Sequence, residues 1–133
     1  MVVFDGEVVA DAVAGWRVLE TSHPPTYYLP PESIRPGVLR PAPGGSFCEW
    51  KGRAVYLDVV SGRRRANRAA WTYPDPTPAF VAIARYVAFY AGPMDACYVG
   101  DEQVTPQPGG FYGGWITSRV VGPFKGEPGS EGW

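Results

Sequence analysis

The sequence predicts a mainly β fold, a small antiparallel barrel or sandwich of six to eight strands with one short helix. Two observations support this. Short runs rich in Val, Ile and aromatic residues recur between turn signals along the 133-residue chain. The 17 Gly and 15 Pro residues are interleaved with 14% aromatic residues, and disordered segments are poor in aromatic residues. We therefore interpret the Gly and Pro residues as tight turns of an ordered domain.

The length, composition and net charge of the chain limit the class of protein. A chain of this length can form one domain, 1–133, whose core needs neither a metal ion nor a disulfide. Twelve basic and thirteen acidic residues give a net charge of −1, which favours neither nucleic acid nor a membrane as a partner. With no apolar run of membrane-spanning length and no signal-peptide pattern, we expect a cytoplasmic protein. Cys48 and Cys97 are then reduced thiols, and with a single histidine they predict no metal site and no cofactor.

The first third of the chain predicts a hairpin followed by a strand that faces the core. Asp5-Gly6 between two Val-rich arms is a strong hairpin signal. In the strand that follows, Trp16, Val18 and Glu20 share the more apolar face, so Glu20 ends a core-facing row. The His-Pro-Pro at 23–25 then ends the strand, because proline has no N–H to donate.

The middle of the chain predicts a long antiparallel pair. The expected elements are an extended segment at 26–29, a helical turn within 30–37, a loop at 38–47, a strand at 51–62 and, after a Ser-Gly turn, its antiparallel return at 63–73. In the strand, Lys51 has the same parity as Val55 and Leu57. Lys51 is therefore expected to point to the core side, where it can meet Glu20. The arginines of the run 62–68 are interpreted as solvated side chains of the hairpin rather than a phosphate-binding patch.

The last third predicts the helix and two further β segments. Thr77-Pro78 is a typical helix start, with a hydroxyl cap and proline at the first helical position, so a helix is expected at 78–85. The run YVAFY at 86–90 fits either a continued helix or a strand, and its aromatic and β-branched residues favour the strand. A hairpin about Gly100-Asp101 and a strand at 114–121 follow.

The Gly/Pro-rich tail, 106–133, is expected to pack on the rest of the domain. Trp115, Phe124 and Trp133 are its candidate anchors. Its aromatic residues fit a second copy of the chain equally well, which would give a homodimer.

Four segments, ETSHPPTYYLPPESIR, CEWKGRAVYLDV, AWTYPDP and VAFY, resemble in order and spacing a bacterial family known as domain of unknown function 427. The resemblance runs from about Val2 to Asp101, and makes 1–105 a family core and 106–133 an extension. Its most specific element is Cys-x-Trp-Lys-Gly, found here from Cys48 to Gly52, with Glu49 where many members carry proline.

The resemblance implies a mainly antiparallel β-tent, similar to methionine sulfoxide reductase B and the thalidomide-binding domain of cereblon, and it implies no function. The chain has neither the paired Cys-x-x-Cys elements nor the Arg-His-Cys motif found elsewhere in that fold. Structural zinc and reductase activity are therefore not carried over.

Glu20 and His23 are the candidate catalytic residues. A carboxylate at the end of a core-facing row loses water, and an imidazole nearby can relay a proton. The alternative is structural: Glu20 pairs with Lys51 or caps backbone N–H groups, and His23 fixes the turn.

Cys48, Trp50 and Lys51 are candidate ligand contacts. An ammonium near Cys48 would make its thiol nucleophilic, although lone cysteines usually serve as small apolar side chains. Lys51 can hold an anionic ligand or form a structural ion pair.

Aromatic residues complete the candidate site, with Tyr28, Tyr56, Trp71 and Tyr73 as ligand contacts and Tyr27 beside them. Such rings can line a concave pocket or simply fill the core. The sequence thus predicts a pocket for an unknown small molecule near Glu20, His23 and Lys51, with acid–base catalysis as an option. The competing hypothesis is a non-enzymatic module that binds a protein or peptide through its aromatic surface and tail.

Overall fold

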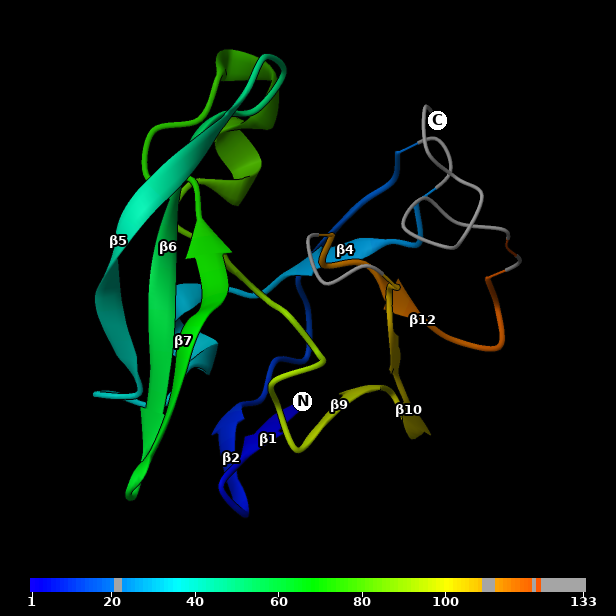
Figure 1. The fold of residues 1–133 in the computed structure, drawn as a ribbon. Coiled ribbons are helices and arrows are strands. Elements are labelled where there is room, and N and C mark those ends of the chain that lie inside the picture. Colours follow the sequence, from blue (N-terminus) through cyan, green and yellow to red (C-terminus); the bar gives the residue numbers. More distant parts are fainter. Residues whose placement is uncertain (21–22, 109–111, 121, 123–133) are drawn as a thin grey trace.

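The computed structural model describes residues 1–20, 23–108, 112–120 and 122 (Figure 1). Within them lie twelve strands and two short 3-10 helices. In chain order these are β1 (Val2–Phe4), β2 (Glu7–Ala10), β3 (Trp16–Val18), β4 (Thr26–Tyr28), η1 (Pro31–Ser33), β5 (Leu39–Cys48), β6 (Gly52–Ser61), β7 (Arg64–Thr72), η2 (Pro78–Ile83), β8 (Val87–Phe89), β9 (Ala96–Val99), β10 (Glu102–Gln103), β11 (Thr105–Pro106) and β12 (Trp115–Ile116). None of the helices in this part of the chain is long and apolar enough to cross a membrane.

The strands form two four-stranded sheets, ordered β10-β9-β1-β2 and β5-β6-β7-β8, and two ribbons, β3-β4 and β11-β12. All pairs are antiparallel, which confirms the mainly antiparallel β fold. Several strands are only two or three residues long, so their number exceeds the six to eight expected. Over the described residues the sheets do not close into a barrel: the long strands β5, β6 and β7 lie together along one side, with β4 and β12 opposite (Figure 1).

Two expected hairpins and one expected strand are confirmed. The β1–β2 hairpin turns at Asp5 and Gly6, both with positive φ (54° and 74°), as the tight hairpin turn requires. The β9–β10 hairpin turns at Gly100, and 87–89 form a strand, β8, rather than a continued helix.

The prediction of a loop at 38–47 is wrong. These residues form β5, the edge strand of the larger sheet, paired with β6 from Leu39 to Cys48. Its Pro-Ala-Pro-Gly segment lies in a register break between Pro41 and Gly45. Proline is tolerated at a sheet edge and in a bulge because no ladder hydrogen bond is required from it there.

The expected parity of β6 is also wrong. Tyr56, with 8% of its surface exposed, is buried, whereas Val55 and Leu57 are only half-buried. A register shift between Leu57 and Val59 then reverses the alternation, so that Val59 is fully buried. Period-two reasoning fails here because three residues of β7, 67–69, lie opposite the single residue Asp58 of β6.

Three further elements are shorter than expected. Of the strand expected at 114–121, the described residues form only Trp115–Ile116, β12. The strand that includes Trp16 ends at Val18. Trp16 is 50% exposed and does not face the core, whereas Val18 is half-buried and packs against a hydrophobic cluster. The segment 78–85 forms only a kinked 3-10 helix, and Thr77 does not cap it: its hydroxyl donates to the Trp50 carbonyl instead.

Two hydrophobic clusters fill the interior. The larger joins both four-stranded sheets, through residues such as Phe4, Val59 and Phe89, and includes Trp115 of the tail. The second is mostly aromatic and lies against β4, β6 and β7; its buried members are Tyr28, Ala54, Tyr56, Trp71, Tyr73, Ile83 and Ala88. Phe124 and Trp133, the other expected anchors of the tail, lie outside the described residues.

Candidate functional site

A cavity of about 240 Å³ lies beside the aromatic cluster. Eight of the nine residues singled out from the sequence line it: Glu20, His23, Tyr28, Cys48, Lys51, Tyr56, Trp71 and Tyr73. They come from β4, β6 and β7, from the segment before β4, from the end of β5 and the turn that follows it, and from the residue after β7. Antiparallel pairing of β6 with β7, and of β7 with β8, brings these distant segments to one place.

Lys51 lies at the cavity and forms an ion pair with Glu20. Only 10% of the Lys51 side chain is exposed, against 38% for Glu20. Its ammonium also lies 5.9 Å from the centroid of the Tyr73 ring, within cation–π distance. Burial alone would lower the pKa of Lys51, but the hydrogen bond and the charge of Glu20 outweigh burial and raise it. The ammonium is therefore charged across the neutral range.

The turn that carries Lys51 is fixed by its backbone rather than by strand parity. The Lys51 carbonyl accepts the Thr77 N–H at 2.9 Å, and the next residue, Gly52, has a φ of 109° that side chains disfavour. A Cβ at Gly52 would lie 3.4 Å from the Asp75 carbonyl oxygen. The sequence expectation that Lys51 meets Glu20 is thus met, by a different route.

His23 is held by the tail. Its Nδ1 lies 3.0 Å from Nε2 of Gln107, and its ring packs edge-on against Tyr112 with centroids 4.8 Å apart. The Gly114 N–H donates to Oε1 of Gln107 at 3.1 Å. Because that backbone group can only donate, it fixes the amide orientation and makes Nε2 of Gln107 the donor to His23. The neutral His23 ring then carries its proton on Nε2.

Burial keeps the hydroxyl groups of the tyrosines that line the cavity protonated. Burial raises the pKa of Tyr28 and of Tyr73, and the charge of Lys51 only partly offsets this at Tyr28. The Tyr28 hydroxyl accepts a hydrogen bond of 3.3 Å from Nε1 of Trp71. These rings both fill the second core cluster and line the cavity, so core packing and pocket formation do not exclude each other.

Trp50 is the expected site residue that lies outside the cavity. Its side chain is 70% exposed and borders an adjacent hollow together with Glu20, His23, Cys48 and Glu49. Cys48 lines both hollows as a free, half-buried thiol. Within the described ranges, no group of three or more His, Cys, Asp and Glu side chains is arranged to hold a metal ion.

Sequence reasoning missed the contribution of Tyr90 and of the tail, whose Gln107, Tyr112 and Gly113 also line the cavity. The available signal was the glycine pair in FYGGW. A Cβ at Gly113 would lie 2.2 Å from Cη2 of Trp71, so only glycine lets the tail approach the indole. Glycine between aromatic residues therefore marked a close contact with a ring.

Comparison with known proteins adds a family. The model of the family described as "Domain of unknown function (DUF427)" matches residues 1–100, most of the chain and most of the cavity lining. No curated protein matches the sequence.

Proposed function

The chain belongs to the DUF427 family, whose description assigns no activity, and we propose that it binds a small organic molecule in the cavity lined by Glu20, His23 and Lys51. The single observation that carries the proposal is the convergence of these three polar side chains on one aromatic-walled hollow. Apolar, ring-lined pockets with a few convergent polar groups are the usual form of small-molecule sites.

The charges and the size of the cavity indicate the class of ligand. Lys51 and Glu20 neutralise each other, so the pair presents a donor beside an acceptor without net charge. A volume of about 240 Å³ equals that of about eight water molecules at roughly 30 Å³ each. A small, flat group without net charge that carries adjacent N–H and C=O satisfies both constraints for the part of the ligand in this cavity, because its carbonyl can accept from Lys51 while its N–H donates to Glu20.

Acid–base catalysis on such a ligand is the second part of the proposal. With its proton on Nε2, neutral His23 can donate a hydrogen bond to a ligand oxygen on which negative charge develops, and Glu20 can accept a proton as a base. Gln107 supports this role because its hydrogen bond selects the tautomer of His23.

The test is a two-dimensional NMR titration with 2-pyridone, acetamide and phenol as probes. We expect saturable shifts of the Trp71 indole N–H and of the Cys48 and Lys51 amides, strongest with 2-pyridone. Glu20→Gln and His23→Ala should abolish these shifts while lowering the melting temperature only slightly.

Glu32→Gln provides the matched control, because it removes one exposed carboxylate far from the cavity lining. The proposal fails if none of the three probes saturates, or if Glu20→Gln binds 2-pyridone as the wild type does. A large loss of stability without any effect on binding would assign Glu20 and His23 a structural role.

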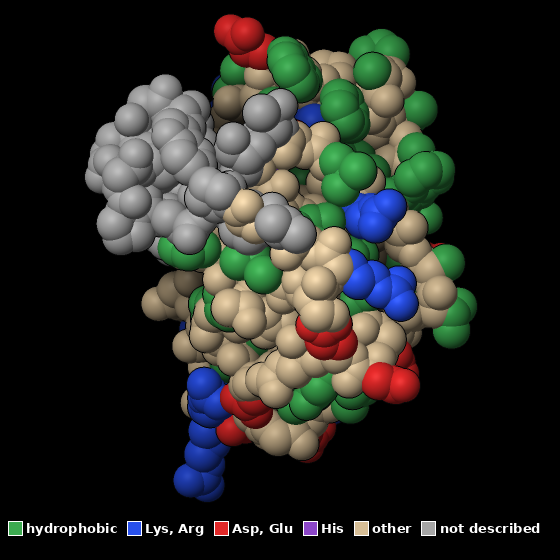
Figure 2. Space-filling view, turned by 90° about the vertical axis from the view of Figure 1, so that its right-hand side faces the viewer, with side chains coloured by type: hydrophobic (Ala, Val, Ile, Leu, Met, Phe, Trp, Pro, Cys, Tyr) green, Lys and Arg blue, Asp and Glu red, His purple; other side chains and the backbone are tan. Residues whose placement is uncertain are grey.

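The exposed aromatic residues favour a second candidate function, an interaction surface for a protein or peptide. Phe47 and Trp50 are each 70% exposed and border the cavity and the adjacent hollow. Figure 2 shows hydrophobic side chains gathered over the upper part of one face of the molecule. Sedimentation velocity distinguishes this function: self-association that Trp50→Ser abolishes, with 2-pyridone binding unchanged, would support it.

A further inference from the structure

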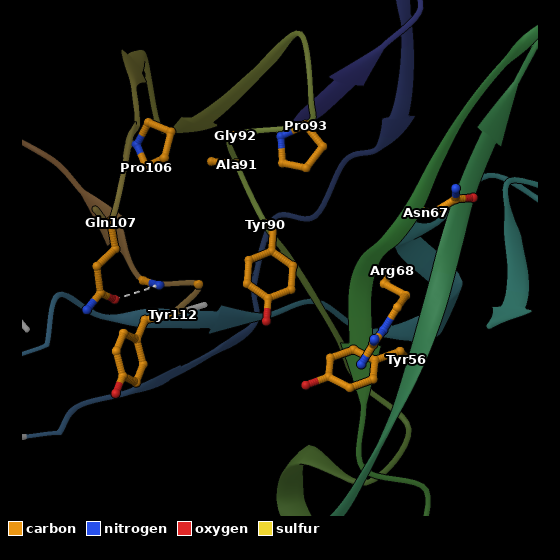
Figure 3. A pocket seen from close by; sticks show the side chains of 12 residues that line it. Tyr56, Asn67, Arg68, Tyr90, Ala91, Gly92, Pro93, Pro106, Gln107 and Tyr112 are labelled. Atoms are coloured by element: carbon orange, nitrogen blue, oxygen red, sulfur yellow. Dashed lines mark hydrogen bonds between the residues drawn. The ribbon is translucent and has the colours of Figure 1, made fainter. Parts of the chain in front are cut away.

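A second and larger cavity, of about 670 Å³, adjoins the candidate site. It lies between β6 and β7 on one side and residues 90–93, 106–107 and 112–114 on the other (Figure 3). The two cavities share five lining residues: Tyr56, Tyr90, Gln107, Tyr112 and Gly113. They are therefore neighbouring compartments separated by side chains, chiefly phenol rings.

The size of the compartments suggests that one ligand occupies both. Small-molecule sites usually measure roughly 300–1,000 Å³. The smaller cavity, at about 240 Å³, falls below this range, and the larger falls within it. A ligand anchored at Glu20 and Lys51 can therefore extend into the larger cavity by passing the shared wall.

Arg68 is the one charged residue among the described residues that line the larger cavity. Its guanidinium carbon lies 4.3 Å from the centroid of the Tyr56 ring; Figure 3 shows the two side chains next to each other. Stacking holds the planar donor fork of arginine in place, which reduces the entropy lost when it binds an oxyanion. Asp58, whose carboxylate accepts from the Arg68 backbone N–H, also accepts from the Arg65 side chain, so its charge is already paired.

The backbone at Arg68 is unusual. Its φ is 50°, in the left-handed region that favours glycine or asparagine. This strain is maintained at the β6–β7 register shift by the hydrogen bond of 2.8 Å from the Arg68 N–H to Asp58. Bulges that redirect one side chain are frequent beside binding sites, and here the redirected side chain is the lone cation of a cavity.

We propose that the larger cavity binds the carboxylate of a ring-bearing organic acid through Arg68. A carboxylate matches the guanidinium fork with two parallel hydrogen bonds. Ala91, Pro93 and Pro106 supply apolar walls for the ring. A single cation among such walls suits a monoanion better than a polyphosphate, which would need several cations. As a statement about the natural ligand, the inference rests on the proposed function and deepens it: the ligand is an acid whose other end reaches Glu20 and Lys51.

The experiment is a titration of the protein with benzoate, phenylacetate and 3-phenylpropionate at constant ionic strength, followed by NMR. At least one should give saturable shifts at the amides of Asn67, Arg68 and Gly92, and its neutral amide should bind far more weakly. Arg68→Gln should weaken the interaction about tenfold or more, because charge-assisted hydrogen bonds are lost. Arg68→Lys, which keeps the charge without the fork, should give an intermediate affinity.

Arg63→Gln is the control, since Arg63 lies exposed in the turn of the same β6–β7 hairpin and lines neither cavity. Equal binding of acid and amide, equal binding by Arg68→Gln, or no saturation by any of the three acids would overturn the inference. Glu20→Gln separates it from the proposed function: it should abolish 2-pyridone binding and leave the carboxylate at Arg68 bound.

Discussion

Gly113 sets the distance between the tail and the aromatic cluster. Its hypothetical Cβ would overlap the far edge of the Trp71 indole at 2.2 Å, well inside van der Waals contact. The indole has little freedom to withdraw, because it is tilted against Tyr90 at 4.7 Å between centroids and donates to Tyr28. Because glycine carries a hydrogen atom where alanine carries a methyl group, Gly113 can pack against Trp71 and line both cavities.

Gly113→Ala should therefore destabilise the protein by about 1–3 kcal/mol, the usual range for overpacking a close contact. Chemical denaturation followed by circular dichroism measures this loss. Gly92→Ala is the matched control, because no atom lies within 4 Å of its hypothetical Cβ although Gly92 lines the larger cavity. An equal effect of the two substitutions would contradict the role given to the Trp71 contact.

At the scale of elements, Asp58 holds the β6–β7 pair in its shifted register. Its carboxylate accepts from the Arg68 backbone at 2.8 Å and from the Arg65 guanidinium at 2.5 and 3.0 Å. The Arg68 backbone hydrogen bond and the Arg65 side chain lower the pKa of Asp58 below its ordinary value of 3.8. A lowered pKa in the folded state means that ionised Asp58 stabilises the fold.

Asp58→Asn should accordingly lower the melting temperature at pH 7, because the ion pair to Arg65 is lost. The lowered pKa also determines how the stabilisation by Asp58 changes with pH. Asp58 contributes its full stabilisation above about pH 4, where the unfolded chain is also ionised, and loses it as the pH falls through the folded pKa.

The gap in melting temperature between wild type and Asp58→Asn should thus stay constant from pH 7 to about pH 4 and narrow below it. Thermal melts across this range measure it. Asp75→Asn, at an exposed position outside the strands, should show no such gap. A gap that widens in acid would refute the assignment.

For the whole molecule, local patterns predicted the hairpins and the composition of the site, because turn chemistry and aromatic enrichment are local signals. The convergence of Glu20, His23 and Lys51 on one hollow also followed from the sequence. The parity of β6 did not, since a bulge depends on pairing with β7. Strand β5 was not predicted either. Its prolines indicate a loop, and they fit a strand only because β5 lies at the edge of the sheet.

The role of the tail was predicted only in outline, at Trp115. Gln107 contacts His23 and Gly113 contacts Trp71 only because the chain returns to these residues in the folded structure. Local sequence patterns do not predict such contacts between distant residues. The alternative that the tail binds a second copy of the chain stays a prediction.

Trp115 links the tail to two other parts of the fold. Its Nε1 donates to the Phe89 carbonyl of β8 at 2.9 Å, and its backbone N–H donates to Pro25 at 2.8 Å. Its ring stacks on Tyr27 of β4 with centroids 5.4 Å apart, and only 2% of the residue is exposed. Loss of this side chain would therefore loosen the large sheet, the β3–β4 ribbon and the tail together.

Trp115→Ala should cost about 3–5 kcal/mol of unfolding free energy, the range for removing a fully buried tryptophan, whereas Trp50→Ala, at a position 70% exposed, should change it by less than about 0.5 kcal/mol. Guanidinium titrations followed by far-UV circular dichroism compare the two without relying on tryptophan fluorescence. Because Gln107 and Trp115 flank the same ribbon, Trp115→Ala should also release His23 and weaken 2-pyridone binding. A variant that loses stability but binds 2-pyridone as before would show that the tail supports the fold without positioning the site.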